Sequence, residues 1–462
     1  KQVIPDLSSY VGYEAAYNDY VNGVMSSDEF IRKVKFMETV NTDWLGLLMQ
    51  DTYSHAHTLS ISGGSENVRY YTSLGYSNEN GNLKGEENSR YSAMAKMDIN
   101  YNKFIMSFNL NGNVQKKEYT PQEVGLMTYA LNTARSVGAY NEDGSLMFYQ
   151  RDDDLAHTYS KPFSIINERK NTDDDIQSNA ISMSANMEYR VIPCLKAGMQ
   201  FSYGISNFEE RVYFGEKSWY AANLRKEYAP DSPNSGYLSS DSEMPVGGEL
   251  RLNSTKNENY SVRANLSFNK FLDNENTHQF QASVIGELSS TLYTGFAITK
   301  RGYIPERGML FDDINLPDTW GYVEFPNYDG WLKGNASAKG ILTHNLTRQV
   351  GLVGTLFYAY KDAYIFNANM RIDGSNKFGD RSNEKLNPIW SVSGRWNIHE
   401  NLLSNKWWIN TLALKASFGY QGNMSAQDSP NLIIQRKGTH WAFNELYSSI
   451  KYYPNPHLKW EK

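Results

Sequence analysis

Three acidic clusters are the first features of the sequence whose residue types suit a chemical task, and that task would be cation binding. They are Asp152-Asp153-Asp154, Asp173-Asp174-Asp175 and Glu209-Glu210. Carboxylate oxygens that converge on one point can bind Ca²⁺. None of the clusters has the alternating D-x-[DN]-x-[DN]-G spacing of a calcium loop. We therefore interpret them as solvated loop carboxylates, keep Ca²⁺ in these loops as the alternative, and assign no metal ligand and no cofactor.

Catalytic groups are not indicated by the nucleophiles and bases of the chain. Of the 8 His residues, His157, His278, His344 and His440 could serve as bases, but no G-x-S-x-G segment or close Ser, His and Asp arrangement accompanies them. His55 and His57 lack the third ligand that a zinc site needs. We expect a protein that is not an enzyme.

Aromatic side chains outside the regular pattern are the candidate contacts for a substrate or a partner protein. Such rings can stack on sugar rings or contact peptide side chains, although rings of this kind also pack loops together. The candidates are Trp219, Tyr220, Trp320, Tyr322, Trp331 and Trp441.

Alternation with a period of two residues is the dominant pattern of the chain, and it predicts β-strands. It is clearest at 364–373, where apolar Phe366 and Met370 alternate with Asn367 and Arg371. We count roughly twelve such runs of about ten residues each, the length of a tilted transmembrane strand. Their connections alternate between short (63–67, 102–103, 191–194, 270–278, 361–363) and long (114–176, 207–257, 291–349). This parity is typical of outer-membrane barrels, which have tight periplasmic turns and long extracellular loops.

Composition supports the same class. Aromatic residues make up 14% of the chain and no apolar run is long enough for a spanning helix, which excludes a disordered chain and a helical membrane protein. The net charge of −6 argues against nucleic acid as a partner. The single cysteine, Cys194, permits no internal disulfide.

In the last strands, charged residues occupy the alternate positions that carry polar side chains. These residues should face a water-filled lumen. These lumenal charges are Arg371, Asp373, Arg395 and Lys415. The interpretation we favour is that they brace the wall rather than contact a substrate. Gly374 is expected in a tight turn with positive φ.

Before the first strand, the sequence has helical spacing with a cap at Ser26-Ser27. We therefore divide the chain into a partly helical extracellular excursion at 1–56, a barrel wall with long loops at 57–420, and an extracellular loop at 421–462.

Several stretches resemble the SusC/RagA-type TonB-dependent transporters of the Bacteroidetes outer membrane. Asn41-Thr42-Asp43-Trp44-Leu45 and His57-Thr58-Leu59-Ser60-Ile61-Ser62-Gly63-Gly64 are similar to the TDW segment and the NLSVSGG strand of that family. Further resemblances are 361–364 to KDRY, 371–379 to RxDGSSRFG, 415–423 to KLRASYGQTGN and 455–461 to NPNLKWE.

The resemblance implies an all-β, antiparallel transmembrane barrel of about 22 strands, of which this chain would supply about 12 as a middle section. It implies import of an oligomeric nutrient with a SusD-like surface lipoprotein, and contact with the TonB complex through an N-terminal region and plug that these residues do not include. The first and last strands of this section should then be open edges, each without a neighbouring strand from this chain on its outer side.

Two other functions stay open from sequence alone. One is an outer-membrane barrel enzyme, and the other is a soluble glycan-binding β protein. The cargo, glycan or peptide, is left open as well.

Overall fold

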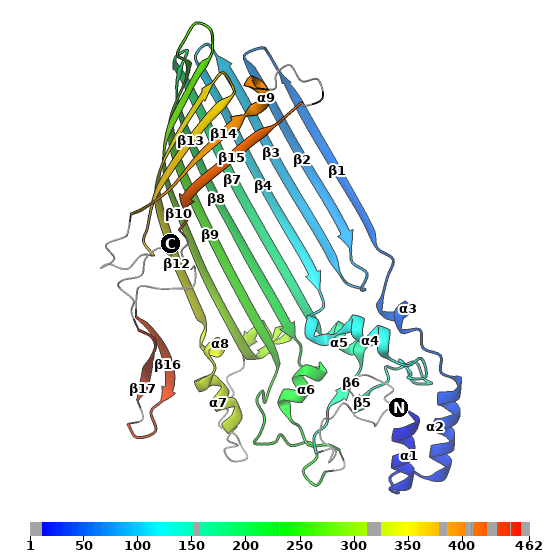
Figure 1. The fold of residues 1–462 in the computed structure, drawn as a ribbon. Helices are drawn as coiled ribbons and strands as arrows, with labels where there is room; N and C mark the ends of the chain where they lie inside the picture. Colours follow the sequence, from blue (N-terminus) through cyan, green and yellow to red (C-terminus); the bar gives the residue numbers. More distant parts are fainter. Residues whose placement is uncertain are drawn as a thin grey trace.

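The structure is a computed structural model that describes residues 12–150, 158–230, 232–311, 325–377, 386–402, 408, 410–422, 432–443 and 445–453. A single antiparallel sheet dominates it, with the strands side by side in chain order (Figure 1). Its path runs β1-β2-β3-β4-β7-β8-β9-β10-β12-β13-β14-β15, and the short β11 pairs with β10. The predicted count of about twelve strands is confirmed.

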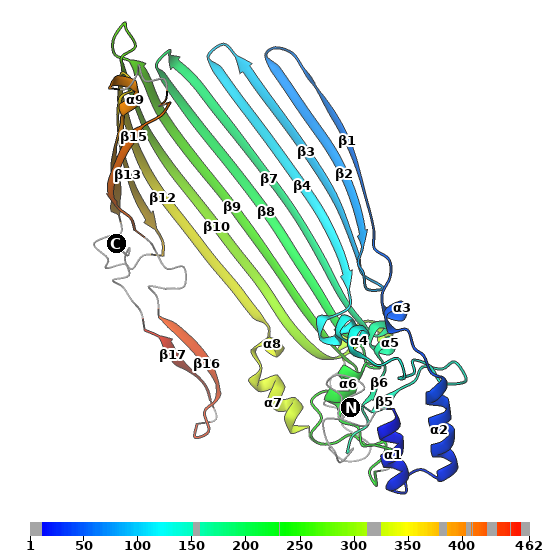
Figure 2. The same cartoon turned by 45° about the vertical axis from the view of Figure 1, so that its right-hand side comes forward.

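The strands of this path differ in length by more than threefold. Their bounds are β1 Tyr53–Gly64, β2 Val68–Asn80, β3 Glu87–Tyr101, β4 Phe104–Tyr119, β7 Thr172–Ile192, β8 Leu195–Phe214, β9 Gly248–Phe271, β10 His278–Ile304, β12 Ile341–Tyr360, β13 Tyr364–Ser375, β14 Asn387–Asn397 and β15 Ala413–Tyr420, with β11 at Leu310–Phe311. Figure 2 shows that the sheet curves, so that β13 and β15 are seen nearly edge-on where β3 and β4 are seen face-on. Among the described residues, β1 pairs only with β2 and β15 only with β14, so the sheet is an open section, as predicted.

The register gives the sheet one apolar and one polar face. Residues opposite each other in neighbouring strands share a face, and the chain of partners Leu74, Ala93, Gly112, Ile181 and Ile205 continues the apolar face across five strands. Farther along, the apolar face carries Leu266, Val284, Leu356, Met370, Val392, Leu414 and Phe418.

The opposite face is polar. It carries the partners Ser182, Asn111, Asn259 and Thr291 and, toward the end of the sheet, Arg371, Arg395 and Lys415. The predicted alternation of apolar and polar residues between the two faces is thereby confirmed.

Tight turns join the strands at one end of the sheet, which we call the turn end. The β3–β4 turn has Asn102 at φ 53°, and the β12–β13 turn has Lys361 and Asp362 at φ 50° and 51°. Positive φ matches the twist of the flanking strands in short hairpins. The opposite end, which we call the loop end, carries the long connections and most of the helices (Figure 1).

Some of the helices at the loop end share a small apolar core of their own. This core joins Trp44 and Leu48 of α3 to Leu126 and Tyr129 of α4 and to Phe163. The helical segments are α1 Tyr13–Val21, α2 Ser27–Thr39, α3 Trp44–Leu48, η1 Gln122–Val124, α4 Leu126–Asn132, α5 Ile165–Lys170, α6 Trp219–Arg225, η2 Pro305–Arg307, α7 Pro326–Gly334, α8 Ala336–Lys339 and, at the turn end, α9 Ile398–Asn401. A two-stranded ribbon of β5 Tyr149–Gln150 and β6 Pro162–Phe163 accompanies them.

The N-terminal cap was placed correctly from sequence. Ser26 accepts a hydrogen bond from the Glu29 backbone N–H, and Glu29 accepts one from Ser26, which completes a capping box at the start of α2. None of the described helices has the length and apolarity to cross a membrane.

Three details predicted from the sequence differ from the structure. The strands β7, β8, β9, β10 and β12 extend well past the predicted ends, so Asp173–Asp175 and Glu209–Glu210 lie on strands rather than in loops. Gly374 lies inside β13 opposite Val350 and does not form a positive-φ turn. The hairpin of β16 Ile433–Thr439 and β17 Leu446–Tyr452 was not predicted, because the whole segment had been taken as a loop.

Candidate functional site

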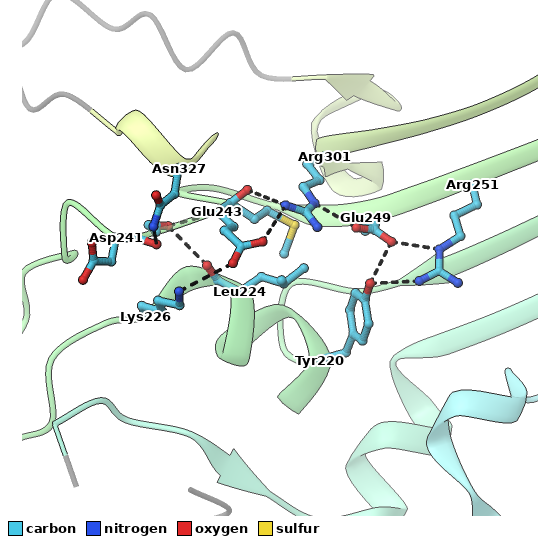
Figure 3. A network of polar contacts seen from close by, with 11 residues as sticks. Tyr220, Leu224, Lys226, Asp241, Glu243, Glu249, Arg251, Arg301 and Asn327 are labelled. Carbon is cyan, nitrogen blue, oxygen red and sulfur yellow. Dashed lines mark hydrogen bonds and ion pairs between the residues drawn. The ribbon is translucent and has the colours of Figure 1, made fainter. Parts of the chain in front are cut away.

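A buried carboxylate, Glu249, is the centre of a polar network at the loop end, on the polar face of the sheet (Figure 3). Glu249 lies near the start of β9 and is only 2% exposed. It accepts hydrogen bonds from Arg251 Nε at 2.8 Å, from Arg301 Nε at 2.9 Å and from the Tyr220 hydroxyl at 2.9 Å. A buried charge is tolerated only when it is paired in this way.

The two arginines connect Glu249 to the long loops. Arg251 donates to Glu123 of η1 at 2.6 Å and to the Tyr220 hydroxyl of α6 at 2.8 Å. Arg301 donates to the backbone oxygen of Glu243 at 3.0 Å, and its guanidinium lies 4.2 Å from the ring centre of Trp331 in α7. The network therefore fastens the β4–β7, β8–β9 and β10–β12 loops to one point on the sheet.

Tyr220, a predicted contact residue, belongs to this network. Its ring stacks on Phe214 with centroids 4.0 Å apart. Burial, followed by the charge of Glu249, raises the pKa of Tyr220 to about 12. The phenol therefore stays protonated at neutral pH and donates to Glu249, which makes Tyr220 a structural tie rather than an open ligand contact.

Trp219 is likewise engaged within the loops. Its backbone N–H donates to Glu168 Oε1 at 2.6 Å, and its ring meets Phe163 edge to face. Glu168 is 2% exposed. Three of the predicted aromatic residues are thus brought together among the packed loops at the loop end, which we call the loop cluster. They are Trp219, Tyr220 and Trp331.

The remaining aromatic candidates are elsewhere. Trp441 lies in the β16–β17 turn, 92% exposed and stacked on His440. Trp320 and Tyr322 lie outside the described residues.

Next to the network, the polar face has a hollow of about 410 Å³. Its lining includes Asp174, Glu210, Glu123, Arg251 and Asn253. Asp174 Oδ1 is buried there without a hydrogen-bond partner. A carboxylate oxygen without an internal partner can accept a hydrogen bond from a hydroxyl or ammonium group of a ligand, whereas Glu210 already accepts from Asn253 and Glu123 from Arg251. We take this hollow and the loop network as the candidate ligand site.

The predicted pair of Arg371 and Asp373 is formed on the polar face of the sheet. Arg371 Nε lies 2.6 Å from Asp373 Oδ2, and its Nη2 lies 4.0 Å from Glu287, which also pairs with Arg263 at 3.3 Å. Gly351 is opposite Asp373, and a Cβ at Gly351 would lie 2.8 Å from Asp373 Oδ1. The missing side chain makes room for the pair to lie flat on the sheet.

Arg395 and Lys415 are opposite each other on the same face. Arg395 donates to Asn397 Oδ1, two residues along its strand. The structure therefore brings Arg371 and Asp373 together but gives Arg395 a local amide partner instead of a carboxylate.

The acidic clusters and the histidines form no metal centre in the described part of the chain, where no group of three or more His, Cys, Asp or Glu could hold an ion. Asp152–Asp154 lie outside the described residues. Asp175 pairs with Arg211 at 2.9 Å. His55 and His57 contact each other edge to face, and His55 also contacts Tyr76, so they form part of an aromatic cluster.

Sequence analysis missed Glu249, Arg251, Arg301 and Glu168. Only a weak indication of this network was present in the sequence. Glu249 and Arg251 are two residues apart in β9 and therefore lie on the same, polar face of the strand. The partners that bury them come from distant loops.

Comparison with known proteins agrees with the fold and the motifs. No family model matches the chain. It is 26% identical to TonB-dependent receptor P26 of Formosa agariphila over 91% of the chain and 38% of that receptor. It is 24% identical to TonB-dependent receptor SusC of Bacteroides thetaiotaomicron over 92% of the chain and 40% of that receptor.

Solved structures of the RagAB peptide importer share the fold. The open-open state superposes with a TM-score of 0.66 at 18% identity, covering 91% of this chain and 42% of that one. Another RagAB structure covers 99% of this chain and 50% of that one with a TM-score of 0.65 at 17% identity. The resemblance to SusC/RagA-type TonB-dependent transporters is confirmed, and the sheet has the fold of part of the antiparallel barrel in these structures. The chain spans about two fifths of the length of the curated relatives it matches.

Proposed function

We propose that these residues form part of the wall and loop cluster of a TonB-dependent importer that carries an oligomeric nutrient across the bacterial outer membrane. The observation that carries the proposal is the two-faced sheet. Its apolar face leaves Leu59 64%, Leu266 53% and Phe418 67% exposed, a surface that lipid would cover. A soluble glycan-binding sandwich would bury that face in its core, so this alternative is disfavoured.

The loop network and the hollow beside it support a cargo path on the polar face. In this proposal the loops project outside the cell, where a SusD-like lipoprotein covers them, and force from the TonB complex acts through a part of the polypeptide other than these residues. No catalytic group is required. The relatives are named as receptors and importers, which also favours transport over an outer-membrane enzyme.

The test is growth of a strain that lacks the gene and is complemented with the full-length protein, on oligosaccharides or oligopeptides as sole nutrient. We expect growth on one class only, and loss of that growth when TonB is deleted. TonB-independent growth would contradict the proposal.

A matched pair of variants tests the cargo site. Asp174→Asn with Glu210→Gln alters the hollow, whereas Lys96→Gln removes a charge from the same face away from the hollow, where Lys96 lies 3.2 Å from Asp98. We expect the first variant to lower uptake at equal surface abundance and the second to leave it unchanged.

A further inference from the structure

The hollow of about 410 Å³ beside the loop network lies between the sheet and two of the long loops. Four of its lining residues are opposite one another on β7, β8, β9 and β10 and form a row on the polar face: Asp174, Val212, Arg251 and Thr299. The β4–β7 loop contributes Glu123 of η1, and the β10–β12 loop contributes Ser337 of α8. A ligand in the hollow would therefore contact the sheet and both loops at once.

The positive charge of the hollow is already neutralised by the protein. Among the described residues that line it, Arg251 is the one cation. Arg251 donates hydrogen bonds to Glu249 at 2.8 Å and to Glu123 at 2.6 Å. It also donates to the Tyr220 hydroxyl, and its guanidinium lies 4.8 Å from the ring centre of Phe214 (Figure 3). An anionic ligand would have to compete with these partners for Arg251.

The negative charge of the hollow is not neutralised in the same way. In the part of the chain that the structure describes, Asp174 and Glu210 have no cationic partner. Glu210 accepts a hydrogen bond from the neutral Asn253 amide at 3.3 Å. Asp174 Oδ1 is buried and has no hydrogen-bond partner. A buried carboxylate oxygen without a partner is unfavourable, and a donor that reaches it from the hollow removes that penalty.

The charge balance favours a cationic ligand. The described lining carries three carboxylates, Asp174, Glu210 and Glu123, against the one guanidinium of Arg251. This excess repels phosphate, sulfate and carboxylate groups. A metal ion fits poorly, because in the described residues no group of three or more His, Cys, Asp or Glu could hold one. A primary ammonium group fits better, since it is compact and carries three hydrogen-bond donors.

We propose that this hollow binds a primary ammonium group of the cargo, with Asp174 and Glu210 as its acceptors. The inference rests on the proposed import function and names the substrate class: an oligomer with free amino groups. Basic oligopeptides and oligosaccharides of amino sugars both carry such groups. The hydroxyls of Thr299 and Ser337 line the same hollow and supply hydrogen bonds for the uncharged groups beside the ammonium.

The test is calorimetric titration of the full-length protein, purified in detergent, with two pairs of probes. A chitosan tetramer is compared with its fully N-acetylated form, and a lysine-containing tetrapeptide is compared with the same peptide acetylated at every amine. Acetylation removes the positive charge and keeps the rest of each probe. In one pair we expect the amine form to bind about tenfold more tightly, the scale on which one charge-assisted contact changes binding.

The pair that shows the preference distinguishes amino sugar from peptide. Equal affinities within both pairs, tighter binding of the acetylated forms, or no binding of any probe would overturn the inference. This comparison uses the unmodified protein and does not depend on a variant folding.

A matched pair of variants places the ammonium in the hollow. Asp174→Asn keeps the size of the side chain and removes its charge, so the preference for the amine form should fall about tenfold. The control is Asp98→Asn, which removes a carboxylate from the exposed pair with Lys96 on the same face and should keep the preference. An unchanged preference in Asp174→Asn, or an equal loss in both variants, would overturn the assignment to this hollow.

The inference and the proposed function fail in different ways. TonB-dependent growth without any preference for amines would contradict the inference and leave import standing. TonB-independent growth would contradict import itself.

Discussion

Glu249 is the residue on which the loop cluster depends most. Glu249→Ala would leave the Arg251 and Arg301 guanidinium groups without their shared carboxylate. Breaking a buried pair in this way typically costs about 3 to 5 kcal/mol. We expect Glu249→Ala to expose the β8–β9 and β10–β12 loops to protease at the cell surface.

The matched control is Glu258→Ala, which breaks the exposed pair between Lys256 and Glu258. Exposed ion pairs contribute only about 0 to 1 kcal/mol. Equal protease sensitivity in the two variants would mean that Glu249 does not hold the loops.

The ion pair of Arg371 and Asp373, unlike the buried network of Glu249, is exposed and should contribute little to stability. Arg371 is substantially exposed on the polar face. Because an exposed pair is worth about 0 to 1 kcal/mol, Arg371→Ala with Asp373→Ala should leave nutrient uptake nearly unchanged. Complete loss of uptake at normal surface abundance would show instead that the pair contacts cargo or plug.

At the scale of elements, the β9–β10 turn depends on one carboxylate. Asp273 accepts hydrogen bonds from the Thr277 hydroxyl and from the backbone N–H groups of Thr277 and His278. The Thr277 hydroxyl, followed by the two backbone donors, holds the pKa of Asp273 at about 2.

The sign of the pH effect follows from that lowered pKa. The stabilisation from Asp273 is fully present above its ordinary pKa of 3.8 and is lost as the pH falls through about 2. We expect Asp273→Ala to lower the melting temperature strongly at pH 7 and much less near pH 2, where about half of the carboxylate is protonated. The check is a pair of melts in detergent, and an equal decrease at both pH values would contradict this role.

The sequence predicted the elements best where apolar and polar residues alternate regularly. Met370 and Asn369 alternate, and in the proposed barrel one side of β13 contacts lipid and the other contacts water. Near the loop end both sides of a strand are wet, so Asp173–Asp175 show no alternation and were assigned to a loop. Glu249 was missed because its burial comes from α6, α7 and the ends of distant strands.

At the scale of the whole molecule, the division into two faces is the property on which every functional proposal rests. Met370 and its neighbour Asn369 lie on opposite faces of β13, opposite Gly354 and Thr355 of β12. Introducing arginine on a lipid-facing surface costs about 2 to 4 kcal/mol near the bilayer midplane, whereas a wet lumen accepts it.

We therefore expect Met370→Arg to reduce the folded fraction of the full-length protein in the outer membrane, and Asn369→Arg to leave it close to the unmodified level. The folded fraction is measured from the heat-modifiable migration of the barrel on gels. If Asn369→Arg were the damaging variant, the polar face would be the one in lipid, and the lumenal placement of Asp174, Glu249 and Arg371 would have to be reversed with it. Equal tolerance of both arginines would mean that neither face of β13 contacts hydrocarbon.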